Sequence, residues 1–213
     1  MAHTVLLFLA LAAGASALQP VLDRIAIDEA VAIGRSRIES VRTRFHQPYR
    51  TRVNRAPLDF IDIVTPFRRV EIEAELRARA GTRSLSQRDA LAMLDTAGGD
   101  LDVFAEFTFH PLNTYIGVPD YAVSLLATGR ASTPELPPRG LQRIPRYGAR
   151  LQGAPLPYPI APQPPRGSEP MLGGTVIATF NVNLIDPNGV YDVVVREAGN
   201  ELARARVNLA ALR

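Results

Sequence analysis

Histidine is the side chain whose charge changes most readily near neutral pH, and this chain contains only three. His3 lies in an apolar N-terminal stretch, which leaves His46 and His110 as candidates for acid–base or metal chemistry. The absence of cysteine excludes thiol nucleophiles, thiolate zinc sites and iron–sulfur clusters. Two isolated histidines do not match the usual zinc ligand sets. We therefore expect no metal and no cofactor.

Carboxylates are the remaining residues that could support catalysis. Asp102, Glu106 and His110 share one face of a predicted strand, but residues four apart on a strand are separated by about 13 Å. They do not form a catalytic pair unless another strand supplies a partner. Two carboxylates suffice for glycoside cleavage. A carboxylate-based hydrolase of envelope polymers, with Asp120 as a third candidate, therefore stays open as an alternative function.

Arginine supplies all 24 basic residues, because the sequence has no lysine. Its planar, permanently charged guanidinium suits carboxylate and phosphate groups. Seven arginines and one glutamate fall between residues 35 and 55, in a chain of net charge +3. This local excess fits either a surface for an anionic partner, or a solvated helix face beside an edge strand whose arginines discourage pairing with another chain. The binding surface that we predict consists of Arg42, Arg44, Arg50, Arg52, Arg143, Arg146, Tyr147 and Arg150.

A second candidate for binding is the segment HPLNTYIGVP, residues 110–119. Asn113 can bond to local backbone, and Tyr115 is an aromatic side chain in a loop. Loops that carry such residues often bind ligands. The segment is either a binding loop, with His110, Asn113 and Tyr115 as its contacts, or an ordered crossover between two strands.

Residues 1–17 have the composition of a secretory signal peptide. An apolar run is followed by small residues at Ala15 and Ala17, the positions that signal peptidase requires. The run is shorter than the roughly 18–20 residues needed to span a bilayer, although retention as an anchor is the alternative. We expect an exported chain, periplasmic or extracellular, comprising residues 18–213, with no transmembrane segment. Export also argues against nucleic acid as a partner.

Apolar periodicity predicts about three helices in the first half of the chain. The first covers residues 28–44, where apolar residues recur at four-then-three spacing. The second covers residues 67–80, with Thr65 as its N-cap and Gly81 as its C-terminal cap. This segment also alternates as a strand does, but its composition and its i,i+4 Glu–Arg pairs favour helix. The third covers residues 87–96.

The second half of the chain is predicted to be rich in strands. Strict alternation makes residues 101–109 the clearest case, and turn residues divide the C-terminus into a three-stranded meander. Residues 133–170 contain eleven prolines and are predicted to be one long loop. The predicted strands are residues 49–53, 58–64, 101–109, 121–128, 175–185, 190–197 and 201–209.

Together these elements predict an α+β protein that is mainly β. We expect a β-sandwich-like antiparallel domain with the helices packed on it. A single domain would cover residues 18–213, helical over 18–99 and β-rich over 100–213.

The shortage of catalytic residue types and the clustered arginines favour a non-catalytic binding protein. Its partner would be an anionic envelope component or another protein. The alternatives are the hydrolase described above and a structural subunit of an envelope assembly that uses an exposed strand edge.

Overall fold

The computed structural model describes residues 18–110, 112–128, 135–148 and 171–213. The predicted signal peptide and most of the predicted Pro-rich loop lie outside the described residues. The elements, in chain order, are α1 (Arg24–Gly34), α2 (Glu39–His46), η1 (Gln47–Tyr49), β1 (Arg50–Arg55), β2 (Leu58–Val64), α3 (Pro66–Arg79), α4 (Gln87–Ala97), β3 (Leu101–Thr108), β4 (Tyr121–Ala127), β5 (Gly140–Tyr147), β6 (Met171–Phe180), η2 (Val182–Leu184), β7 (Val190–Glu197), β8 (Asn200–Asn208) and η3 (Leu209–Ala211).

The strands form two antiparallel sheets. One has the order β1-β2-β3-β6-β5 and the other has the order β4-β7-β8. The C-terminal meander was therefore predicted wrongly, because β6 pairs with β3 and β5 while only β7 and β8 form a hairpin. The Asp186–Gly189 turn does form, but η2 and this turn carry the chain from one sheet to the other.

Strand β5 lies inside residues 133–170, which were predicted to be one long Pro-rich loop. The loop was predicted from the eleven prolines of residues 133–170, among them Pro145, which lacks the N–H that a central strand must donate. Because β5 is an edge strand, the missing donor costs no ladder hydrogen bond on its outer side. The described part of the chain thus has eight strands, where about seven were predicted.

Four α-helices are present in the described residues, because the first predicted helix is divided into α1 and α2. Gly34 ends α1 at a close approach to α3. A Cβ at this position would lie 2.3 Å from the carbonyl oxygen of Glu71. Ser36 then accepts a hydrogen bond from the amide of Ile38, and the chain turns into α2. The apolar periodicity of residues 28–44 gives no sign of this break, because packing against α3 imposes it.

Helices α3 and α4 confirm their predictions. Thr65 accepts a hydrogen bond from the amide of Arg68 and so caps α3, and Ser86 caps α4 in the same way. Gly81 follows α3 with a positive φ of 64°. The composition of α3, rather than its alternation, therefore indicated its conformation.

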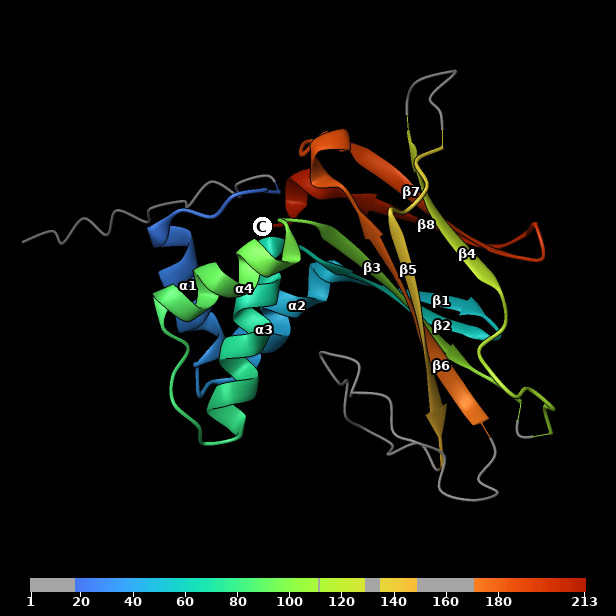
Figure 1. Cartoon of the computed structure of the whole chain (residues 1–213), viewed down its shortest axis with the longest axis horizontal. Coiled ribbons are helices and arrows are strands. Elements are labelled where there is room, and N and C mark those ends of the chain that lie inside the picture. The colour runs from blue at the N-terminus through green and yellow to red at the C-terminus, as the bar shows by residue number, and fades with distance from the viewer. Residues whose placement is uncertain (1–17, 111, 129–134, 149–170) are drawn as a thin grey trace, which may run out of the picture.

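The helices gather at one end of the molecule and the sheets at the other (Figure 1). Apolar residues of both sheets form one cluster, and the helices have a second cluster of their own. Ile72 of α3 joins the two parts by packing with Val64 of β2 and Phe104 of β3. Among the described residues, no helix combines the length and apolar character needed to cross a membrane.

Candidate functional site

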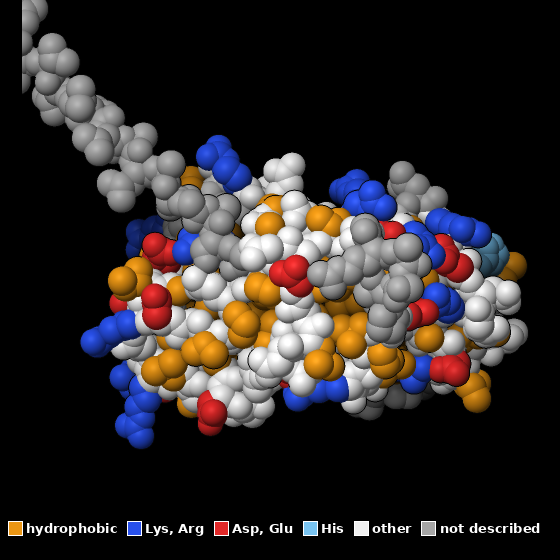
Figure 2. Space-filling view, turned by 90° about the horizontal axis from the view of Figure 1, so that it is seen from above, with side chains coloured by type: hydrophobic (Ala, Val, Ile, Leu, Met, Phe, Trp, Pro, Cys, Tyr) orange, Lys and Arg blue, Asp and Glu red, His pale blue; other side chains and the backbone are white. Residues whose placement is uncertain are grey.

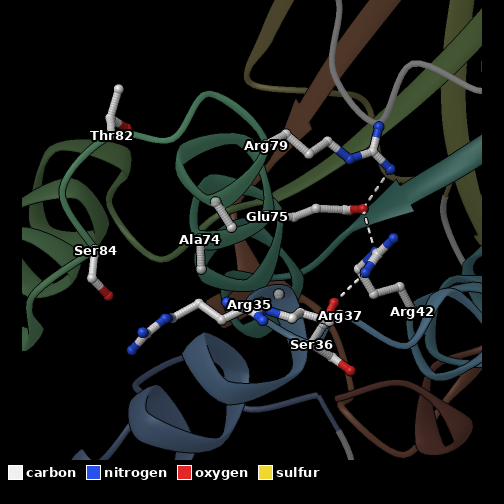
Figure 3. A pocket seen from close by; sticks show the side chains of 11 residues that line it. Arg35, Ser36, Arg37, Arg42, Ala74, Glu75, Arg79, Thr82 and Ser84 are labelled. Carbon is white, nitrogen blue, oxygen red and sulfur yellow. Dashed lines mark hydrogen bonds and ion pairs between the residues drawn. The ribbon is translucent and has the colours of Figure 1, made fainter.

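An open pocket of about 380 Å³ lies at the helical end of the molecule. The turn between α1 and α2 forms one wall, and the C-terminal half of α3 forms the other (Figure 3). Its polar lining carries four arginines and a single carboxylate, which gives it a local positive excess. The polar residues that line it are Arg35, Ser36, Arg37, Arg42, Glu75, Arg79, Thr82 and Ser84.

Glu75 stands between two of these arginines, as Figure 3 shows. Its Oε1 atom lies 2.8 Å from Nε of Arg42 and 2.6 Å from a terminal nitrogen of Arg79. Its Oε2 atom lies 3.3 Å from Nε2 of His46. Burial alone would raise the pKa of Glu75, but His46 and Arg79 outweigh it and lower the pKa to about 2. Glu75 is therefore ionised at neutral pH.

Behind Glu75, and one helical turn before it on α3, lies Glu71. Its side chain is fully buried, and neither carboxylate oxygen accepts a hydrogen bond from a described residue. One of these oxygens lies 3.3 Å from Nε2 of His46, a contact too long to count as a strong charge-assisted bond. Burial raises the pKa of Glu71 and outweighs the opposing effect of His46. Glu71 is the least compensated carboxylate in this part of the molecule.

His46 faces opposite charges with its two ring nitrogens. Nε2 faces the carboxylates, whereas Nδ1 lies 3.3 Å from Nε of Arg68, which donates to it. Burial lowers the pKa of His46, but the two glutamates outweigh burial and raise it. Since Arg68 can only donate, Nδ1 must be an acceptor, and the neutral ring carries its proton on Nε2.

Arg68 continues this network towards the five-stranded sheet. It donates to both carboxylate oxygens of Asp62 and to the carbonyl of Ile63, at 2.5 Å for the carbonyl. Asp62 also pairs with Arg50, at 2.6 Å. A continuous run of charged groups therefore leads from the pocket, through Glu75 and His46, to strand β1.

The same three side chains, His46, Glu71 and Glu75, have one potential metal-ligand atom each within 4.8 Å of one another. Two observations disfavour a metal there. A metal on Nε2 would move the ring proton to Nδ1, where it would face the Nε–H of Arg68. A divalent cation would also add charge beside Arg68, Arg42 and Arg79. A second proton on His46 would meet the same conflict at Nδ1, so the group that can take up a proton without it is Glu71.

The predicted arginine surface is divided by the fold. Arg42 lies in the pocket, and Arg50 belongs to the network behind it. Arg44 and Arg52 are exposed, on α2 and β1 respectively.

Arg143, Arg146 and Tyr147 belong to β5, at the opposite edge of the sheet from β1. Arg143 pairs with Asp120, and Arg146 pairs with Glu106. Tyr147 packs against the core, and Arg150 lies outside the described residues. The face seen in Figure 2 likewise shows arginine side chains at several separate places around its rim. The structure therefore does not bring the predicted set together as one patch.

The loop residues form local contacts. His110 accepts a hydrogen bond from the amide of Leu112, and Asn113 donates to the carbonyls of His110 and Met171. The Tyr115 ring packs edge-on against Phe109. These contacts hold the described residues of the segment, and its role in binding stays a prediction.

The carboxylates considered for a hydrolase are each held by an arginine. Asp102 pairs with Arg69 at 2.5 Å and accepts from Thr179, and Glu106 accepts from Thr175 as well as pairing with Arg146. Asp120 is largely exposed beside Arg143. These pairings hold the carboxylates as structural acceptors on β3 and beside β4.

Sequence reasoning missed the network around Glu71. One signal was present, because Arg68, Glu71 and Glu75 recur at three-then-four spacing on α3, and Arg42 and His46 are four apart on α2. What the sequence could not supply was the packing of these two helix faces against each other. Comparison of the chain with protein-family models, with curated proteins and with solved structures finds no match.

Proposed function

We propose that this protein is an exported, non-catalytic binding protein whose arginine-lined pocket holds an anionic ligand. The observation that carries the proposal is the pocket itself, in which four arginines face one carboxylate. Clustered guanidinium groups recognise carboxylate, phosphate and sulfate groups through paired N–H donors. The two sheets would form a sandwich-like scaffold that presents the helical end to its ligand.

Arg35 and Arg37 are the groups best placed to meet a ligand first. Both are exposed, and neither forms an ion pair with another residue in the described ranges. Arg42 and Arg79 line the same pocket but already share Glu75. Ser36, Thr82 and Ser84 add hydroxyl or backbone donors nearby. An anionic group of an envelope polymer or of a partner protein would satisfy this lining.

Binding of a small polyanion tests the proposal. Inositol hexasulfate is a suitable probe, because its sulfate groups do not titrate near neutral pH. Calorimetry should show binding that weakens as salt rises. The double variant R35Q/R37Q should bind at least tenfold more weakly than the unmodified protein, since each lost contact to a charged group is worth about 1.5–3 kcal/mol.

The matched control is R52Q/R55Q, which removes the same charge from exposed positions on β1. This control should weaken the affinity by no more than about threefold. Equal losses in the two double variants would show that the probe responds to overall charge, and would contradict a specific pocket.

A further inference from the structure

The two oxygens of Glu75 face different environments. Oε1 is held by Arg42 and Arg79 in the wall of the pocket, and Oε2 lies 3.3 Å from Nε2 of the half-buried His46. The carboxylate is itself almost fully buried, with 3% of its side chain exposed. Glu75 therefore connects the open pocket to the charged groups behind it.

A ligand anion in the pocket must share Arg42 and Arg79 with Glu75. Both arginines then divide their donors between two acceptors, and the positive charge that compensates Glu75 is reduced. A second negative charge also comes close to the buried groups, where screening by water is weak. Occupation of the pocket thus makes the electrostatic potential at His46 and Glu71 more negative.

The groups behind Glu75 are held in place and do not move to offset this change in electrostatic potential. Arg68, which faces Nδ1 of His46, is held by Asp62 from β2 and packs over the ring of Tyr49 from η1. From α2, Arg42 is already engaged with Glu75 and with the carbonyl of Ser36. Phe45, also from α2, contacts His46 with an uncharged aromatic ring.

Glu71 is the group that can still accept a proton. Its buried carboxylate oxygens accept no hydrogen bond from the described residues, and the ionised Glu75 beside it adds a negative charge that His46 and Arg68 offset only in part. A proton added to Glu71 would neutralise this buried charge. Since Glu71 and His46 lie 3.3 Å apart, the titration of Glu71 is coupled to that of His46.

We propose that anion binding in the pocket is coupled to the uptake of a proton by the buried His46–Glu71 pair, with Glu75 as the connecting group. This inference rests on the proposed function, because it concerns regulation of the same site. It makes the protein an acid-favoured anion binder. Over the pH range in which the pair titrates, the affinity rises as the pH falls, by up to about tenfold per pH unit for one proton.

Calorimetric titration with inositol hexasulfate at pH 6, 7 and 8 tests the coupling. At each pH the titration is repeated in two buffers that differ in ionisation enthalpy, so that the difference in heat gives the number of protons taken up. The unmodified protein should take up as much as about one proton per ligand, and its affinity should fall from pH 6 to pH 8.

Three variants separate the parts of the inference. E71Q, or H46Q if E71Q fails to fold, should bind the probe with proton uptake abolished and pH dependence flattened. R35Q/R37Q should bind weakly but keep its uptake per bound ligand. E106Q, which changes a glutamate paired with Arg146 on β3, should behave as the unmodified protein does.

The failures are distinguishable. Binding by the unmodified protein with no proton uptake at any of the three pH values would overturn the coupling and leave the proposed function standing. Uptake that persists in both E71Q and H46Q would overturn the assignment to this pair. No binding heat at any pH would overturn the proposed function itself.

Discussion

Charged side chains are arranged differently at the helical end and at the sheet end of the molecule. At the sheet end, carboxylates are matched by arginines. Glu135 pairs with Arg196 and Glu106 with Arg146, each completed by a Ser or Thr hydroxyl, and Asp192 of β7 is shared by Arg204 and Arg206. At the helical end, one buried network shares its partners, and Glu71 lacks hydrogen-bond donors among the described residues. Complete pairs stabilise a surface, whereas an incompletely compensated network responds to added charge.

The largest difference between the two ends should appear when an arginine is removed. R68M leaves Asp62 and Glu71 buried with less compensation, and removing one partner of a buried ion pair costs about 3–5 kcal/mol. R196Q at the sheet end removes the partner of a part-exposed glutamate and should cost about 1 kcal/mol or less. Urea unfolding of both variants measures the free energies, and equal losses would contradict the contrast.

The helical end should also be intolerant of added volume between α1 and α3. In G34A the new Cβ would lie 2.3 Å from the carbonyl oxygen of Glu71 and 2.9 Å from Cβ of Ala74. Overpacking of this kind costs about 1–3 kcal/mol. The control is G117A, where a Cβ meets nothing within 4 Å. Thermal unfolding should show a lower midpoint for G34A alone; an unchanged midpoint would mean that the helices are not so closely packed.

A smaller effect concerns pH. Burial raises the pKa of Glu71, so the folded protein holds this proton more tightly than the unfolded chain does. Its contribution to stability is therefore complete below the ordinary glutamate pKa of 4.5 and is lost as the pH rises through the raised value.

E71Q cannot lose that proton. We expect E71Q to be about 1–2 kcal/mol more stable than the unmodified protein at pH 8, because it lacks the buried negative charge. The difference should vanish towards pH 4, where Glu71 is protonated and also uncharged. Denaturant unfolding across this range provides the measurement. The same substitution at Glu106, which already has an arginine partner, should not stabilise the protein at pH 8. A parallel pH dependence in E71Q would show that Glu71 does not titrate.

The smallest expected effect is that of metal. Because Arg68 donates to Nδ1 of His46, we expect Zn²⁺ to raise the unfolding midpoint by less than about 1 °C, where tight binding would raise it by several degrees. A large rise that disappears in H46Q would show that the network holds a metal rather than a proton.

Local signals in the sequence were sufficient where the decisive contact is local. Thr65 and Gly81 mark the ends of α3, and Ser86 begins α4, because caps act within one turn. Two predictions failed where the decisive contact comes from elsewhere. The break after Gly34 depends on α3, and the place of β6 depends on its pairing with β3 and β5.

The candidate site shows the same limit. The arginine excess over residues 35–55 correctly drew attention to Arg42, since charge is visible in composition. The importance of Glu71 was not visible, because a glutamate on an amphipathic helix is normally solvated. Packing of α1 and α2 against α3 buries it beside His46. Arg143 and Arg146 were grouped with Arg50 and Arg52 because sequence alone does not reveal that β1 and β5 form opposite edges of the sheet.

The most direct test of the account is to locate the anion on the molecule by NMR. Titration with inositol hexasulfate should shift the backbone amides of Arg35, Ser36, Arg37 and Thr82, together with the side-chain resonances of His46 behind the pocket. Amides of β5 and of the loop that carries Tyr115 should not move. Shifts confined to the sheet end, or spread evenly over exposed arginines, would contradict the claim that the helical end binds the anion.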